Sequence, residues 1–277
     1  MPARIDAHAH VFRRDLPMVA GRRYTPDYDA TLTDLFSHLD ANRLDQAVLV
    51  QPSFLGTDNS YLLEAIAAAS GRLRGIAMVA PDVTDHQLDE LALGGVVGVR
   101  FNLVGVPMPE LRSTAWTSLL RRVVGLGWHV ELHREARDLH LLIESALHEG
   151  ARVVVDHYGR PDPAFGSADV NLNALMAFAS SRRVWVKLSA PYRCTSNPEE
   201  FEREAALRFA NAFGADRLLW GSDWPHTQCE AKASVAASLD SLRASLGDKM
   251  LDAVLGCTAR DLYAFPTAEP VPSLFTL

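Results

Sequence analysis

Eight short apolar runs, rich in β-branched residues, recur along the chain and are separated by longer amphipathic segments. They occupy residues 4–12, 46–52, 74–80, 95–103, 128–135, 151–159, 183–190 and 217–226. Seven of the eight contain the unbroken apolar stretch that is typical of parallel strands covered on both faces. The pattern therefore predicts a buried parallel sheet.

The segments between these runs have the spacing of amphipathic helices. In the first segment, apolar residues recur every three or four positions, at Leu32, Leu35, Phe36 and Leu39. Asp34 stands three residues after Thr31, which is the spacing of a helix-capping pair. The predicted helices occupy residues 31–44, 58–69, 110–126, 138–149, 172–181 and 198–213, with two more near 230–246 and 248–263.

This alternation predicts an α/β fold, a single (β/α)8 TIM barrel. We expect one domain over residues 1–277, with a C-terminal tail from about residue 265. A doubly wound open sheet would also alternate strands and helices, but it usually carries a glycine-rich phosphate turn after an early strand. The stretch DAHAHVF at residues 6–12 contains no such turn, so the barrel is favoured.

Composition excludes several classes of protein. The chain has 277 residues, is 48% hydrophobic and 22% charged, and carries a net charge of −7, so we expect neither nucleic acid nor an anionic membrane as a partner. No apolar run approaches the roughly 18 residues of a membrane span. Three dispersed cysteines without a CxxC pair, and no signal peptide, predict a reducing, cytoplasmic location.

Polar side chains stand where the predicted strands end. They are His8, His10, Gln51, Ser53, Arg100, Asn102, His133, Glu135, Asp156, His157, Lys187, Ser189, Asp223 and His226. In a (β/α)8 barrel the carboxyl ends of the strands meet at one face and build the active site. Packing alone does not explain polar groups at the same end of so many strands, so we expect a functional site there.

Each of these residues also has a structural interpretation. His8 and His10 alternate with alanines and so share one face of a strand; inside a barrel, unpartnered imidazoles are costly, which favours function. His157 could be a core histidine and Asp223 a turn cap. Arg100 could form a structural ion pair, as could Arg193 and Arg160; Asp162 lies close to Arg160 in sequence, so Arg160 is interpreted as the more structural of the two.

The pattern of motifs resembles a known family. An HxH pair on the first strand, a histidine ending the sixth and an aspartate ending the eighth resemble the amidohydrolase superfamily. The blocks RRYTPDYDA, GVVGVRFNLV, GWHVELHREARDL, VVVDHYGRPD, SAPYR and LLWGSDWPH resemble the amidohydrolase 2 branch that acts on 2-pyrone-4,6-dicarboxylate, from residue 5 to about 263. The resemblance implies a lactonase that hydrolyses a cyclic ester bearing carboxylates, a step in aromatic catabolism.

The resemblance also implies roles for individual residues. His8, His10 and His157 would polarise the lactone carbonyl, and Asp223 would take a proton from the attacking water. The remaining predicted substrate contacts are Arg100, Arg193, Tyr24, Ser53, His133 and His226. The chain departs from the family pattern after Asn102, where basic residues are replaced by Val104, Gly105 and Val106, so we expect a less charged substrate or a substitute such as Arg134.

Metal dependence separates the remaining alternatives. His8, His10, Asp223 and either His133 or His157 could hold one Zn²⁺ tetrahedrally, and His133 occupies a metal-ligand position of other amidohydrolases. The branch that the chain resembles works without metal, so the leading interpretation is metal-free. The alternatives are a zinc-dependent lactonase acting on a sugar lactone or muconolactone, a decarboxylase of the same barrel, and a non-catalytic binding protein for aromatic acids. A small anionic lactone is the expected partner, and a homodimer is an open interpretation.

Overall fold

The computed structural model describes residues 3–266 and contains one eight-stranded parallel sheet. Its strands are β1 (Ile5–Ala9), β2 (Gln46–Val50), β3 (Leu73–Ala77), β4 (Val96–Asn102), β5 (His129–His133), β6 (Arg152–Val155), β7 (Val184–Ser189) and β8 (Leu218–Gly221). All eight coincide with the predicted runs, although the observed strands are shorter. They pair in sequence order, so the sheet has no strand reversal.

The sheet closes on itself between its first and last strands. Ala9 forms a parallel bridge with Trp224, and the amide of His10 donates to the Trp224 carbonyl over 2.8 Å. The amide of Asp223 donates to the His8 carbonyl over 2.9 Å. These contacts confirm the predicted barrel and exclude the open sheet. They also place the residue after β8 directly beside the histidines of β1.

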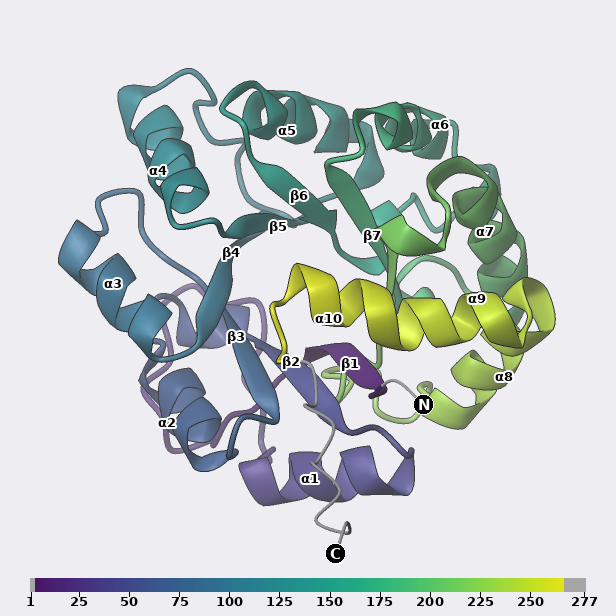
Figure 1. Cartoon of the computed structure of the whole chain (residues 1–277), viewed down its shortest axis with the longest axis horizontal. Coiled ribbons are helices and arrows are strands. Elements are labelled where there is room, and N and C mark those ends of the chain that lie inside the picture. Colours follow the sequence, from purple (N-terminus) through teal and green to yellow (C-terminus); the bar gives the residue numbers. More distant parts are fainter. Residues whose placement is uncertain (1–2, 267–277) are drawn as a thin grey trace, which may run out of the picture.

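Helices surround the barrel, as Figure 1 shows. They are α1 (Leu32–Ala41), α2 (Ser60–Ala68), α3 (Asp85–Leu93), α4 (Thr114–Gly125), α5 (Ala136–His148), α6 (Asn171–Ala177), α7 (Pro198–Phe213), α8 (Val235–Leu246), α9 (Asp248–Asp252) and α10 (Thr258–Leu262). The capping pair predicted at Thr31 and Asp34 begins α1. Helix α3 was not predicted, although a capping box of Thr84 and Gln87 begins it.

The core has two layers. The helices bury leucine-rich faces against the outside of the sheet, with Leu35, Leu119 and Leu142 fully inaccessible to solvent. Inside the barrel, apolar side chains including Ile5, Val48, Ile76, Val154 and Leu219 fill the end at which the strands begin. Burial at roughly 25 cal/mol per Å² of apolar surface makes these layers the main source of stability.

The amino-terminal end of the barrel is covered by α10 and the residues that follow it. This helix crosses the barrel in the foreground of Figure 1. Tyr263 is fully buried there, and its hydroxyl donates to Glu131 over 3.0 Å. Phe265, where the predicted tail begins, is also buried, and residues 267–277 lie outside the described residues. Access to the barrel interior is therefore left to the opposite end.

Within residues 3–266, the structure contains no helix that is both long and apolar enough to cross a membrane.

Candidate active site

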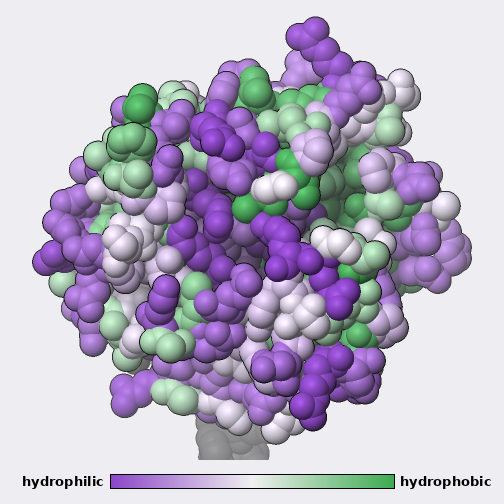
Figure 2. Space-filling view, turned by 180° about the vertical axis from the view of Figure 1, so that it is seen from behind, coloured by the Kyte–Doolittle hydropathy of each residue, from purple (hydrophilic) through white to green (hydrophobic). Residues whose placement is uncertain are grey.

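A cavity of about 140 Å³ lies at the carboxyl ends of the strands. It is lined by His10, Arg23, Tyr24, Pro52, Ser53, Phe54, Arg100, Asn102, His133, His157, Arg160, Arg193, Asp223, Thr227 and Gln228. Figure 2, which views the face opposite that of Figure 1, shows a central hollow where hydrophilic side chains gather. Eight of the ten predicted catalytic and substrate-binding residues line this cavity; the other two are His8 and His226.

Short turns after the strands carry several of the site residues. His157 begins a 3-10 turn directly after Asp156, and Asp223 follows β8 by two residues. Both have left-handed backbone conformations, with φ of 51° and 62°. Such a conformation costs a non-glycine residue about 1–3 kcal/mol and persists where the surroundings enforce it. Here the hydrogen bond from the Asp223 amide to His8 fixes the carboxylate against β1.

The two oxygens of Asp223 have different surroundings. Its Oδ2 accepts hydrogen bonds from the Arg193 Nε and the Tyr192 hydroxyl, both over 2.8 Å. Its Oδ1 instead faces three imidazoles, with the Nε2 atoms of His8, His10 and His157 at 3.6, 3.5 and 3.7 Å. One oxygen is therefore anchored, while the other is held among the histidines at the cavity.

Asp223 is ionised at neutral pH. Burial by itself would raise the pKa of the carboxyl, but the charge of Arg193 and the neighbouring His157 hold that pKa well below its usual range. A carboxylate with one free oxygen beside a cavity is suited to accept a proton from water.

The imidazoles differ in which nitrogen carries hydrogen. The Nδ1 of His10 donates to the Val50 carbonyl over 2.7 Å, so its Nε2 presents a lone pair when the ring is neutral. The Nδ1 of His8 lies 3.0 Å from the Lys187 ammonium, which can only donate. The Oδ1 of Asp156 lies 3.4 Å from the same Nδ1, farther than Lys187. With Lys187 as the donor at 3.0 Å, neutral His8 carries its hydrogen on Nε2, the nitrogen that faces Asp223. His157 contacts a hydroxyl, that of Ser189, through Nδ1 over 2.8 Å, which allows either tautomer.

Burial keeps His8 and His157 neutral. Loss of hydration, with the nearby Lys187 ammonium, lowers the pKa of His8 well below its ordinary value. Burial likewise lowers the pKa of His157 to about 3, although Asp223 and Asp156 oppose this shift. Both rings are thus neutral hydrogen-bonding groups at physiological pH.

Lys187 belongs to a closed set of polar groups beneath the cavity, which we call the inner cluster: Glu131, Asp156, Lys187 and Tyr263. The Lys187 Nζ lies 2.7 Å from Glu131 and 3.4 Å from Asp156. Every member is at most 1% exposed. Lys187 was recognised in the sequence only as a polar strand end; its position beneath His8 emerges from the closed barrel.

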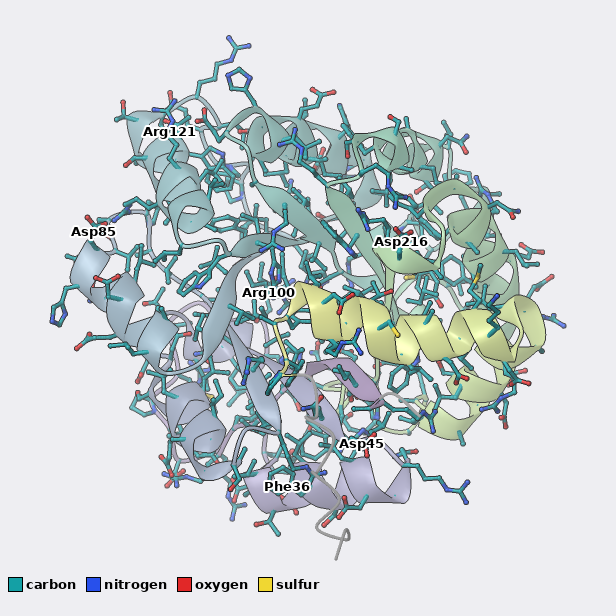
Figure 3. All side chains as sticks on the ribbon, in the orientation of Figure 1. Phe36, Asp45, Asp85, Arg100, Arg121 and Asp216 are labelled. Atoms are coloured by element: carbon teal, nitrogen blue, oxygen red, sulfur yellow. The ribbon has the colours of Figure 1, made fainter. Side chains whose placement is uncertain are left out.

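Arg100 forms an ion pair and also lines the cavity, so its role as a substrate contact stays a prediction. Its Nε donates to Asp156 over 2.8 Å, which is the structural ion pair, and the residue also lines the cavity. Figure 3 shows Arg100 near the centre of the barrel, in contrast to Asp85 and Arg121 at the periphery. A second guanidinium nitrogen lies 3.1 Å from the Nδ1 of His133, and burial together with the Arg100 charge lowers the pKa of that histidine well below its ordinary value.

Three sequence expectations about nearby residues need correction. His226 lines a neighbouring cavity of about 100 Å³ with Trp220 and Glu202, because the turn after Asp223 directs it away. Arg134 is bonded to Asp138 and to the carbonyls of Leu103 and Val106, so it does not replace the missing basic residues.

The third correction concerns Arg160, which was interpreted as structural through Asp162. Among residues 3–266 no carboxylate lies within ion-pairing distance of its guanidinium, and the residue lines the cavity. Arg23 and Tyr192 were not singled out at all. Arg23 stands beside Tyr24 in a block used for the family resemblance, which is the signal that could have found it.

The metal-ligand geometry fits only in part. Within the described residues, ligand atoms of His8, His10 and Asp223 lie within 4.8 Å of one another, as do those of His8, Asp156 and His157. His133 belongs to neither group. His10 and Asp223 each offer a free electron pair, whereas the hydrogen on His8 Nε2 blocks that nitrogen as a ligand while Lys187 donates to the other. With Lys187 as the donor to Nδ1, His8 would have to lose its Nε2 hydrogen before that nitrogen could bind a metal ion.

Comparison with known proteins identifies the family. Residues 5–265 match the family model described as amidohydrolase. The chain is 35% identical over 240 residues to the 2-pyrone-4,6-dicarboxylate hydrolase of Comamonas testosteroni, covering 80% of this chain and 76% of that protein. It is 33% identical over 234 residues to the 4-sulfomuconolactone hydrolase of Hydrogenophaga intermedia, covering 82% and 76%.

Solved structures agree with this assignment. A protein from Pseudomonas putida, assigned as a 2-pyrone-4,6-dicarboxylic acid hydrolase, superposes with a TM-score of 0.89 at 42% identity, covering 96% of this chain and 99% of that one. A protein from Acinetobacter baumannii with the same assignment, solved with citric acid bound, gives a TM-score of 0.89 at 35% identity, covering 95% and 99%. This chain belongs to the amidohydrolase family.

Proposed function

We propose that this amidohydrolase hydrolyses a small carboxylated lactone of the 2-pyrone-4,6-dicarboxylate type. The observation that carries the proposal is the free Oδ1 of Asp223, held among three imidazoles at the wall of an arginine-rich cavity. The relatives named above are hydrolases of a pyrone dicarboxylate and of a sulfomuconolactone, both of which are anionic cyclic esters. The cytoplasmic location and the homodimer remain predictions from the sequence.

In this mechanism Asp223 acts as the general base. Its Oδ1 accepts a proton from water as the water oxygen bonds to the lactone carbonyl carbon. The ring C–O bond then breaks, and the released oxygen takes the proton from Asp223, which restores the base and completes hydrolysis. Because Arg193 and Tyr192 hold Oδ2, the base keeps a fixed direction. A positioned base typically contributes roughly 10²–10⁴ in rate.

The three histidines would have different roles in the reaction, because different ring nitrogens carry their hydrogens. His8 presents the N–H on its Nε2 toward Asp223 and does not line the cavity, so it would orient the base. His157 lines the cavity and, when Ser189 donates to its Nδ1, presents an N–H that suits it to stabilise the negative charge that builds on the carbonyl oxygen. His10, whose Nδ1 donates to Val50, presents a lone pair and so orients the attacking water. The three imidazoles that the family resemblance groups together are thus assigned three roles.

Charge in the cavity supports an anionic substrate. Four arginines line it, together with the hydroxyls of Tyr24 and Ser53. A guanidinium grips a carboxylate through two parallel hydrogen bonds, which fixes the ring relative to the base. The relative from Acinetobacter baumannii that binds citric acid, a polycarboxylate, is consistent with this use of the cavity.

We also propose that the reaction needs no metal ion. The proposal rests on the ammonium of Lys187, which donates to His8 Nδ1 and leaves a hydrogen on the nitrogen that a metal would need. The alternative is one Zn²⁺ held by His10 and Asp223, with His8 recruited after proton loss, which would supply Lewis-acid polarisation of the carbonyl.

A spectrophotometric screen tests both proposals. Purified protein is assayed with pyrone dicarboxylates, muconolactones and sugar lactones, before and after treatment with a chelator, and with added zinc. We expect turnover of a carboxylated lactone that neither the chelator nor zinc changes. Stoichiometric zinc in the protein, with activity lost on chelation, would contradict the metal-free mechanism. Turnover of sugar lactones alone would contradict the substrate class.

A further inference from the structure

We propose that Asp6 is a positioning residue, whose carboxylate holds the turn after β8 against β1 so that the free oxygen of Asp223 faces the imidazoles. The inference rests on the proposed lactonase function, in which Asp223 is the base. Asp6 stands two residues before His8 on β1, and its side chain is fully buried. It does not line the cavity, so any effect that it has on the reaction passes through other residues.

Both oxygens of the Asp6 carboxylate accept hydrogen bonds. Oδ1 accepts from the amide of His8 over 3.1 Å and from the amide of Ser222 over 2.9 Å. Oδ2 accepts from the Ser222 hydroxyl over 2.5 Å. Three donors compensate a negative charge that is shielded from water, and hydrogen bonds to an ionised group are among the strongest in proteins. One side chain thus joins β1 to the residue immediately before Asp223.

The His8 amide reaches Asp6 at a point where the pairing of β1 with β2 is irregular. The register of the two strands shifts between Asp6 and Ala9. An aspartate readily accepts a hydrogen bond from the amide two residues further along the chain, and irregular pairing beside a functional site re-aims side chains. The carboxylate that holds the turn after β8 therefore also fixes the backbone from which the His8 ring projects.

The turn after β8 is held at three successive amides. That of Ser222 donates to Asp6, and that of Asp223 donates to the His8 carbonyl over 2.9 Å. The Trp224 amide donates over 2.9 Å to the Ser222 hydroxyl oxygen, whose own hydrogen is directed at Asp6. Asp223 has a left-handed backbone conformation, which persists where the surroundings enforce it. Two of the three amide contacts depend on Asp6, so its carboxylate contributes to that enforcement.

Close packing limits the positions that the Asp6 carboxylate can adopt. A Cβ atom on Gly221 would lie 2.5 Å from the Cβ of His8 and 2.8 Å from the His8 amide nitrogen, so β8 approaches β1 as closely as a glycine permits. The Nε2 of His38, in α1, lies 3.7 Å from Asp6 Oδ2. The His38 ring also stacks on Trp224, with 5.6 Å between the ring centroids. The carboxylate is therefore enclosed by β1, α1 and the turn after β8.

The test compares Asp6→Ala with Asp6→Asn. Alanine removes all three hydrogen bonds, whereas asparagine keeps an oxygen for the two amides and can turn its NH2 group toward the Ser222 oxygen. A misplacement of about 1 Å can cost roughly 10²-fold in rate. We expect kcat to fall about 100-fold in Asp6→Ala and less than about tenfold in Asp6→Asn. KM should stay unchanged in both variants, because Asp6 does not line the cavity.

Two kinetic outcomes would overturn the proposal. An equal loss of kcat in Asp6→Asn and Asp6→Ala would mean that the charge of Asp6 matters and that its hydrogen bonds do not. A rise in KM with kcat unchanged would mean that Asp6 acts on substrate binding and leaves the base in place.

Ser222→Ala provides the test if Asp6→Ala does not fold. It removes the hydroxyl bond to Asp6 and the acceptor for the Trp224 amide, but it leaves both amide bonds to Asp6 Oδ1. We expect a loss of kcat smaller than in Asp6→Ala, again with KM unchanged. An unchanged kcat in Ser222→Ala would contradict the proposal.

Asp169→Ala is the matched control. Asp169 is also a buried aspartate whose carboxylate accepts two backbone amides, those of Asn171 and Asp162, but it does not line the cavity. Its loss should lower the melting temperature without lowering kcat. If Asp169→Ala reduced kcat as much as Asp6→Ala, the loss would reflect general destabilisation and the positioning role would be rejected.

Crystal structures of the wild-type protein and the variants separate this inference from the function beneath it. The distance from Asp223 Oδ1 to His8 Nε2, which is 3.6 Å here, should change in Asp6→Ala and persist in Asp6→Asn. If the wild-type protein hydrolyses no lactone but this distance changes as expected, the lactonase proposal fails while the positioning role stands. If the wild-type protein hydrolyses lactones but Asp6→Ala leaves both the distance and kcat unchanged, the positioning role fails while the lactonase proposal stands.

Discussion

The inner cluster and the cavity above it handle charge in opposite ways, although His8 contacts both. In the inner cluster the charges balance: Lys187 lies between Glu131 and Asp156, and Arg100 pairs with the latter from the side. Glu131, Asp156 and Lys187 are at most 1% exposed. In the cavity, positive charge exceeds negative charge and the surface is open. A buried network whose charges balance fixes the positions of its side chains. An open cavity with excess positive charge instead favours the binding of an anionic ligand.

His8 connects the two regions because its nitrogens face different sides. Nδ1 faces the inner cluster and Nε2 faces Asp223. Chemistry at the cavity therefore depends on a proton position that is set one layer below it. This comparison predicts that changes in the cavity alter turnover, while changes in the inner cluster alter stability first.

The largest effect is expected for Asp223→Asn. Loss of the base should reduce kcat by about 10²–10⁴. Binding of an anionic product should not weaken, because the substitution removes a negative charge and increases the positive surplus of the cavity. Steady-state kinetics and calorimetry on the same preparation measure the two quantities.

Asp85→Asn is the control for this variant, since Asp85 lies on the periphery in α3 and should leave both quantities unchanged. A loss of kcat smaller than about tenfold would exclude Asp223 as the base. Wild-type protein that binds aromatic acids without any turnover would instead support the non-catalytic alternative.

The next largest effect is expected for a change in the inner cluster. Lys187→Met leaves the carboxylate of Glu131 buried without its cation, while Asp156 keeps its ion pair with Arg100. Breaking a buried pair by removing one partner costs about 3–5 kcal/mol. The free energy of unfolding, measured in urea, should fall by that amount. Lys187→Met combined with Glu131→Gln should be more stable than Lys187→Met alone, because the unpaired charge of Glu131 is removed. If the double variant were the less stable of the two, the balance of charges would not explain the cluster.

Local patterns in the sequence were sufficient for much of this architecture. Apolar runs, seven of the eight unbroken, identified every strand, and the alternation of His8 and His10 with alanines placed both rings on one interior face. His157 and Asp223 were found because each directly follows an apolar run. These features depend on residues adjacent in the chain, which is why a sequence without coordinates reveals them.

Features that depend on turns or distant segments were not predictable in this way. His226 leaves the cavity because its left-handed backbone redirects the side chain, and no apolar periodicity signals such a turn. Arg23 reaches Asn102 across 79 positions of sequence. Two errors did have a local signal: the capping box that begins α3, and Asp138, which follows Arg134 by only four residues and pairs with it at the start of α5.

The smallest expected effect is on the pH dependence of the free energy of unfolding, to which His157 contributes. The unfolded chain protonates this histidine near its ordinary pKa of about 6.5, whereas the folded chain does so only near pH 3. Between these values the unfolded state binds the extra proton, so stability falls as pH decreases, by about 2 kcal/mol at pH 5 for this group alone. Asp223 and Asp156, whose pKa values are lowered by folding, lose their stabilising effect only as pH falls below about 4. Between pH 7 and pH 5 Glu202 also titrates, because burial raises its pKa to about 7, and protonation of this group stabilises the folded state as pH falls. Unfolding in urea at these two pH values therefore isolates His157 only when a variant of this residue is compared with the wild-type protein.

His157→Gln should reduce the difference in stability between the two pH values by about 2 kcal/mol, whereas His86→Gln, at an exposed position on α3, should leave it unchanged. An undiminished difference in His157→Gln would mean that another group accounts for the acid sensitivity. His8 is the strongest such candidate, because burial and Lys187 depress its pKa in the same direction. That outcome would assign the pH response to His8, which lies between the cavity and the inner cluster, and not to His157 at the cavity wall. A proton that binds His8 Nδ1 would have to displace the hydrogen bond from Lys187.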